Sequence, residues 1–203
     1  MLVLTKDEDG INKAIDMIYA GEIVLWPSCG VYGFTCDANN KEAVEKIYSL
    51  KARDRGKALP VLVNQRSASK YGKLSEINRI LINNYWPGYL GLIVEKNPRT
   101  PDYVTANKNS VALVCPNALS MEIAEHAGIP LAVTSANISG NKEILEMDEA
   151  IKLFDGRVKA IIKAPKMTGT LNTLIDFTFS PPKILRDGGV SRSALIKYLA
   201  KLQ

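Results

Sequence analysis

The sequence predicts an α/β protein in which helices flank one twisted, mixed sheet. Segments with apolar residues at helical spacing alternate along the chain with short apolar runs that are typical of buried strands. Several of these runs follow one another too closely for a helical crossover, so some neighbouring strands should be antiparallel. The length of 203 residues and the hydrophobic content of 46% suit a single domain over residues 1–203.

The N-terminal part of the chain starts this alternation. Apolar side chains between Ile11 and Tyr19 recur every three or four residues and stop before Gly21, as in a helix with a left-handed residue at its end. A buried strand is predicted over 22–26 and ends at Pro27.

A second helix is predicted to begin at Asn39 or Asn40, because both are good N-cap residue types. Its apolar spacing runs as far as Lys51, so Lys51 and Arg53 should lie at or just beyond its C-terminus. The further elements follow the same rules. Strands are predicted over 60–63, 90–94, 111–115, 130–133, 158–162, 173–177 and 183–186, and helices over 77–85, 121–126 and 193–202.

Composition excludes several classes of protein. The net charge of +5 is a mild excess that suits an anionic substrate, but it is not the dense basic stripe of a dedicated nucleic-acid binder. No apolar run is long enough to span a membrane, and the N-terminus has no signal-peptide pattern, so we expect a cytoplasmic protein that is monomeric by default. The three cysteines lack CxxC spacing, which favours reduced thiols and no metal site.

Nucleotide-binding loops of the common kinds are missing from the sequence. Neither GxxxxGK[ST] nor GxGxxG occurs, so side chains would have to hold any nucleotide. The single histidine, His126, lies near the end of a helix closed by Gly128, where an imidazole commonly complements the helix dipole. Cys29 has no plausible base beside it and is not expected to act as a nucleophile.

Two polar clusters are the best candidates for a site. Lys51, Arg53 and Lys57 could simply occupy a solvated helix end, but a turn at Asp54 to Gly56 would bring the three cations together around one anion. The second cluster contains Ser135 and Asn137 and follows the strand predicted over 130–133. Open α/β sheets usually place ligands at such strand ends.

Six ordered segments resemble the YrdC/TsaC family, which contains the threonylcarbamoyl-AMP synthases. The segments are 26–33 (WPSCGVYG), 47–53 (IYSLKAR) with Lys57, 87–88 (PG), 130–140 (PLAVTSANISG), 172–176 (NTLID) and 184–188 (ILRDG). The resemblance implies a YrdC-like fold with a concave, positively charged cleft. It also implies synthesis of threonylcarbamoyl-AMP and pyrophosphate from L-threonine, bicarbonate or CO2, and ATP with Mg²⁺. The product would pass to the machinery that makes t6A in tRNA.

Residue roles follow from the same resemblance. The catalytic residues would be Lys51, Arg53, Ser135 and Asn137. ATP would be bound by Lys51, Arg53, Lys57, Ser135, Asn137, Asn172 and Arg186. Threonine or its carbamate would contact Ser28, Tyr32, Thr134 and Thr173. No protein nucleophile is required, since these groups would position the reactants and neutralise charge on the phosphates.

Several positions depart from the family pattern. Cys29 and Gly30 replace Asp and Thr, Gly91 replaces a Thr, and Val114 replaces an Arg. Smaller changes are Ala58 for Pro, and Leu171 and Asn172 in place of Pro and Ser. These losses leave a second hypothesis open, a non-catalytic YciO-like paralogue that binds nucleotide or double-stranded or structured RNA. The intact Lys51, Arg53, Ser135 and Asn137 favour the enzyme.

Overall fold

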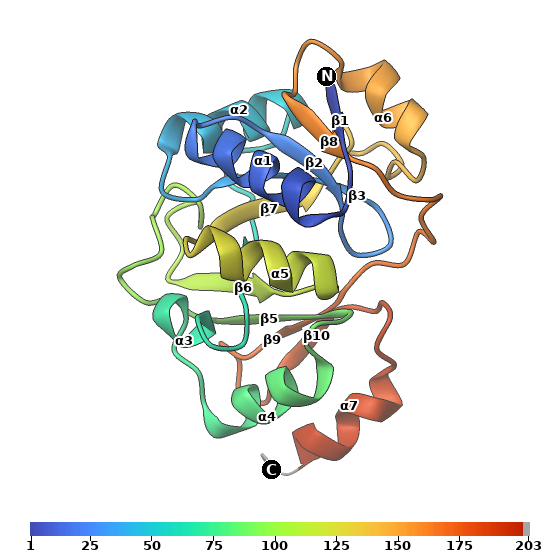
Figure 1. Cartoon of the computed structure of the whole chain (residues 1–203). Coiled ribbons are helices and arrows are strands. Elements are labelled where there is room, and N and C mark those ends of the chain that lie inside the picture. The colour runs from blue at the N-terminus through green and yellow to red at the C-terminus, as the bar shows by residue number, and fades with distance from the viewer. Residues whose placement is uncertain (201–203) are drawn as a thin grey trace.

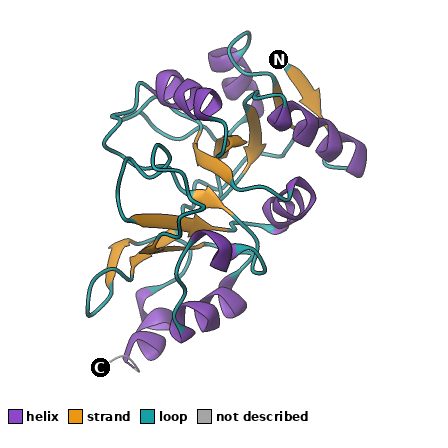
Figure 2. Cartoon of the chain, turned by 90° about the vertical axis from the view of Figure 1, so that its left-hand side faces the viewer, coloured by secondary structure: helices purple, strands orange, loops and turns teal. Residues whose placement is uncertain are grey.

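A computed structural model describes residues 1–200 of the chain. One ten-stranded sheet runs through the molecule in the order β1-β8-β2-β3-β7-β4-β6-β5-β9-β10, with helices packed around it (Figures 1 and 2). The strands are β1 (Leu2–Leu4), β2 (Val24–Pro27), β3 (Tyr32–Asp37), β4 (Val61–Leu62), β5 (Leu90–Glu95), β6 (Ser110–Val114), β7 (Leu131–Ser135), β8 (Ala160–Ile162), β9 (Thr173–Asp176) and β10 (Lys183–Arg186). The helices are α1 (Glu8–Tyr19), α2 (Lys41–Lys51), α3 (Ala68–Tyr71), α4 (Glu76–Tyr85), α5 (Ala118–Ala127), α6 (Met147–Phe154) and α7 (Arg192–Leu199).

Strand pairing in the centre of the sheet positions the candidate clusters. β7 lies between β3 and β4 and is antiparallel to both, whereas β4 and β6 are parallel. The predicted mixture of parallel and antiparallel strands is therefore confirmed. Because β7 ends at Ser135 beside the start of β4, the segment after β7 meets the loop that leads from α2 into β4.

The ends of α2 follow the predicted chemistry. The Asn40 side chain accepts a hydrogen bond from the Ala43 N–H at 3.0 Å, so the N-cap prediction is confirmed at Asn40. The helix ends at Ala52, which has left-handed backbone angles (φ 46°) without being glycine. This residue turns the chain sharply, and the Arg53 N–H closes the turn on the Tyr48 carbonyl.

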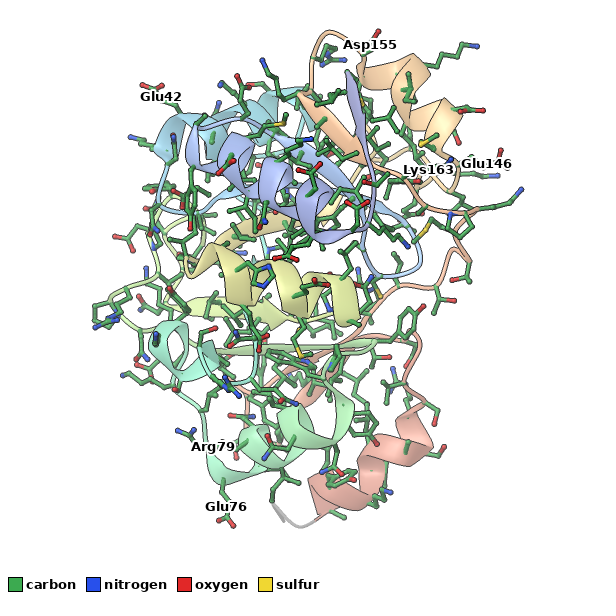
Figure 3. All side chains as sticks on the ribbon, viewed as in Figure 1. Glu42, Glu76, Arg79, Glu146, Asp155 and Lys163 are labelled. Carbon is green, nitrogen blue, oxygen red and sulfur yellow. The ribbon has the colours of Figure 1, made fainter. Side chains whose placement is uncertain are left out.

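Apolar side chains fill both faces of the sheet. The largest buried groups include Trp26, Phe34 and Phe154, and the rings of Phe34 and Phe154 meet edge to face with their centroids 4.8 Å apart. Charged side chains such as Glu42, Glu76 and Arg79 lie at the periphery (Figure 3). Within residues 1–200, no helix has the length and hydropathy needed to cross a bilayer.

Four elements were not predicted from the sequence. β1 and α3 are short, whereas α6 was not predicted although its apolar residues Met147, Ala150, Ile151 and Phe154 recur at helical spacing. The omission of β3 matters most, because β3 joins β2 to β7 at the centre of the sheet. Gly33 and the polar residues of this strand weakened its signal, and tertiary burial outweighed them. The end of the predicted C-terminal helix, beyond residue 200, lies outside the described residues.

Other predictions hold. His126 lies in the last turn of α5, which Gly128 closes with φ 62°. Cys29, Cys36 and Cys115 are free thiols, and all three are buried.

Candidate functional site

The Lys51 ammonium joins the two polar clusters. Its three donors reach the Ser135 carbonyl at 2.5 Å, the Asn137 carbonyl at 2.9 Å and the Asn137 side-chain oxygen at 2.8 Å. The Ser139 N–H returns a bond to the Lys51 carbonyl at 2.8 Å. Segments more than eighty residues apart are thus fixed to each other by four hydrogen bonds.

These contacts change the interpretation of Lys51 and Asn137. Lys51 is only 2% exposed and has no N–H left for a phosphate, and Asn137 also donates to the Asn141 carbonyl at 2.6 Å. Burial, and secondarily the nearby Arg53 charge, lowers the pKa of Lys51 to about 8. In this structure both residues hold the segment after β7 in place, while Thr134 and Ser135 line the adjacent cavity.

That cavity has a volume of about 410 Å³ and is lined by basic and polar groups together with an apolar floor. Its charged side chains are Arg53, Lys57, Lys108, Arg186 and Glu143. Its polar side chains are Ser28, Cys29, Thr134, Ser135 and Asn172. Four cations against one carboxylate favour an anionic ligand.

The loop after α2 folds back as Asp54 and Gly56 indicated. The Lys57 N–H donates to the Asp54 carbonyl at 3.0 Å, and the Gly56 N–H donates to the Asp54 side chain at 2.9 Å. The Arg53 guanidinium fastens this loop through the Lys57 and Ala58 carbonyls at 3.2 and 2.9 Å. Both cations therefore line the cavity from a closed turn.

The C-terminal strands contribute the opposite wall. The Arg186 Nε donates to the Asn172 carbonyl at 2.8 Å, and the Cys29 thiol donates to the Asn172 side-chain oxygen at 2.7 Å. Burial raises the pKa of Cys29 to about 12, although the Arg186 charge opposes this. The thiol is thus a neutral hydrogen-bond donor in this wall and is unsuited to nucleophilic attack.

Lys108 is a cavity cation that sequence reasoning missed. It follows Ala106 and Asn107, which both have positive φ, in the loop before β6. Because β6 is parallel to β4, this loop lies beside the one that contains Lys57, and the Leu59 N–H joins the two at the Val104 carbonyl. Nothing in the polar sequence around Lys108 indicates that this lysine lies beside the loop that contains Lys57.

Two predicted ligand contacts lie outside the cavity. Tyr32 is fully buried, and its hydroxyl donates to the Ala164 carbonyl at 3.3 Å. The Thr173 hydroxyl donates to the Val190 carbonyl at 2.7 Å and accepts from the Val190 N–H at 3.1 Å. The Tyr32 and Thr173 hydroxyls are bonded within the protein, whereas Ser28 and Thr134 line the cavity.

The apolar floor of the cavity accounts for two departures from the family motif, Gly91 and Val114. Val114 pairs with Gly91, and Gly91 pairs with Leu174 in the next strand. A Cβ atom at position 91 would lie 3.1 Å from Leu174 and 3.2 Å from Val114, so these two side chains occupy the space above the glycine. Neighbouring positions that are polar in the family motif thus form one apolar surface.

Gly30 is required by the close approach of another segment. Its φ is 59°, and a Cβ atom there would lie 2.2 Å from the Thr170 carbonyl oxygen. We expect Gly30→Ala to reduce the free energy of unfolding by about 2–4 kcal/mol, through left-handed strain plus the clash. Urea denaturation measures this, with Gly128→Ala as the control, because Gly128 has φ 62° but nothing within 4 Å of its Cβ position. Equal losses in the two variants would contradict the close approach.

The fold and the site together define a class of protein: an α/β domain whose cavity is lined by four cationic side chains and has no glycine-rich phosphate loop. The Sua5/YciO/YrdC family model, described as "Telomere recombination", matches residues 16–188, and the chain belongs to this family.

Relatives and solved structures agree. The chain is 30% identical over 202 residues to the threonylcarbamoyl-AMP synthase of Bacillus subtilis, covering 95% of this chain and 57% of the relative. It is 31% identical to a putative threonylcarbamoyl-AMP synthase of Mycobacterium tuberculosis, covering 94% and 89%. The crystal structure of Pyrococcus abyssi Sua5 complexed with L-threonine superposes with a TM-score of 0.90 at 27% identity, covering 97% of this chain and 60% of that one. The chain thus spans less than two thirds of the Bacillus and Pyrococcus proteins.

Proposed function

We propose that the chain makes threonylcarbamoyl-AMP and pyrophosphate from L-threonine, bicarbonate or CO2, and ATP. The observation that carries this proposal is the cavity in which Arg53, Lys57, Lys108 and Arg186 surround Thr134 and Ser135. The threonylcarbamoyl-AMP synthases among the relatives support the same reaction. The product would serve t6A modification of tRNA.

The chemistry needs positioning and charge neutralisation. Carbamate formed from the threonine amine attacks the α-phosphate, and pyrophosphate leaves. Arg53, Lys57 and Arg186 would hold the phosphates and offset their developing charge, while Ser135 and Thr134 would orient the reacting groups. Lys51 and Asn137 would keep this wall rigid. Magnesium would enter with ATP as part of the substrate.

Pyrophosphate release tests the reaction directly. With ATP and bicarbonate, release should depend on added L-threonine and should fall in Arg53→Ala. Lys41→Ala, which removes an exposed cation from the start of α2, should behave as wild type. Absence of threonine-dependent release from a folded, ATP-binding protein would reject the synthase and favour a nucleotide- or RNA-binding module.

Lys108→Ala should weaken ATP binding about three- to tenfold, because it removes one exposed cation of the cavity, which we propose contacts the outer phosphates together with Lys57. AMP binding should change less, since AMP lacks the outer phosphates. Calorimetry with both nucleotides measures the difference. Arg99→Ala is the matched control, because Arg99 is an exposed cation of the same loop that does not line the cavity. Equal effects of the two substitutions would contradict a direct role for Lys108.

A further inference from the structure

Glu143 is the one carboxylate among the described residues that line the cavity. It is partly buried, and within residues 1–200 none of the ion pairs includes it. An unpaired carboxylate repels phosphate, so its presence beside four cations weakens a site that served phosphates alone. The cavity therefore contains a group suited to a positively charged part of a ligand.

The backbone holds Glu143 firmly in this position. The Asn141 carbonyl accepts from the Asn137 side chain at 2.6 Å, and the Ile144 carbonyl accepts from the Tyr32 N–H at 3.0 Å. Glu143 lies between these two anchors. The same segment is fixed to Lys51 through the Ser139 N–H. The backbone at Glu143 is consequently fixed relative to the end of β7, and its side chain lines the cavity.

Glu143 does not serve as the counter-ion that satisfies Lys51. All three N–H donors of Lys51 are used by oxygens of Ser135 and Asn137. The Glu143 charge only reduces the lowering of the Lys51 pKa that burial causes. Pairing with Lys51 therefore does not explain why the Glu143 carboxylate lies in the cavity.

Two departures from the family motif also suggest that Glu143 serves the ligand. Cys29 stands where the family motif has a carboxylate, and Cys29 lines the cavity that Glu143 also lines. Val114 likewise stands where the motif has a cation, and Lys108 supplies a cation to the same cavity. Each charge missing from the motif thus has a counterpart of the same sign on a different element.

We propose that Glu143 binds the ammonium group of the acceptor amino acid and orients its nitrogen in the cavity. This proposal rests on the proposed function. An α-amino acid has one cationic and one anionic group, so a single carboxylate among four cations fixes its direction. The ammonium lies at Glu143, and the amino acid's carboxylate turns towards the cations.

The test compares ligands with and without the amine. Calorimetry measures binding of L-threonine and of 3-hydroxybutyrate, which is threonine without its amino group. Glu143→Gln should weaken threonine binding at least tenfold, leave 3-hydroxybutyrate binding unchanged or tighter, and leave ATP binding unchanged or a few-fold tighter. Glu149→Gln, an exposed carboxylate of α6 outside the cavity, should change none of these values.

Other outcomes overturn the proposal. Threonine binding unchanged in Glu143→Gln, equal losses of threonine and 3-hydroxybutyrate, or no threonine binding by the wild type would each reject it. Should Glu143→Gln fail to fold, Glu143→Asp must show the same order of effects. Glu143-dependent threonine binding without threonine-dependent pyrophosphate release would reject the synthase and retain the amine site, so the two proposals fail separately.

Discussion

Replacing Lys51 by methionine should lower threonine-dependent pyrophosphate release by more than a hundredfold and destabilise the fold by about 3–5 kcal/mol. Methionine fills much of the lysine volume, but it removes a charged donor from three oxygens of Ser135 and Asn137. The Ser135 carbonyl keeps the Asn137 N–H and the Asn137 side-chain oxygen keeps the Ser135 hydroxyl, so the Asn137 carbonyl is the acceptor left unsatisfied. Each unsatisfied buried acceptor is costly, and the segment after β7 would lose its fixed position. Urea denaturation and the pyrophosphate assay measure the two effects.

The control for this variant is Lys41→Met, which removes an exposed cation from the same helix. It should change neither stability nor release. A Lys51→Met protein of wild-type stability would show that the ammonium does not hold the two segments together. Wild-type release from that variant would remove Lys51 from any role in the reaction.

Replacing Arg186 by alanine should raise the KM for ATP about ten- to hundredfold, because a charge-assisted contact with phosphate contributes about 1.5–3 kcal/mol. The guanidinium lies in the cavity wall, and its Nε bond to the Asn172 carbonyl fixes its direction. Stability should change little, since the side chain is exposed. Steady-state kinetics at constant ionic strength measure the effect.

Arg192→Ala is the comparison for Arg186, because Arg192 lies nearby in sequence but pairs with Asp187 at the surface. Its loss should leave the KM for ATP unchanged. A similar rise in both variants would mean that general positive charge, and no specific contact of Arg186, determines ATP affinity.

Local chemistry made much of the fold predictable. Asn40 caps α2 because its side-chain oxygen accepts a hydrogen bond from a free N–H of the first turn, and Gly128 ends α5 because glycine adopts the left-handed conformation without strain. Apolar runs of four to six residues located most strands. β3 escaped prediction because its stability depends on pairing with β2 and β7, which no local pattern records.

The resemblance to the family motifs identified Arg53, Lys57, Ser135 and Arg186 as candidate site residues. The structure places all four around one cavity. The motifs could not distinguish these four residues, which line the cavity, from Lys51, whose three donors are all bonded inside the protein. Residue type indicates which chemistry is available. Burial and hydrogen bonding decide whether that chemistry faces a ligand.

The sequence by itself determined the α/β class, the ends of α2, the C-terminal end of α5, and the family, because these depend on periodicity, capping and motif order. Only the tertiary structure decided that Lys108 and Glu143 line the cavity and that Tyr32 and Thr173 do not. The parallel pairing of β4 with β6 sets the position of Lys108, and the Tyr32 to Ile144 bond sets that of Glu143. Such long-range contacts form between residues whose local sequences are independent of each other.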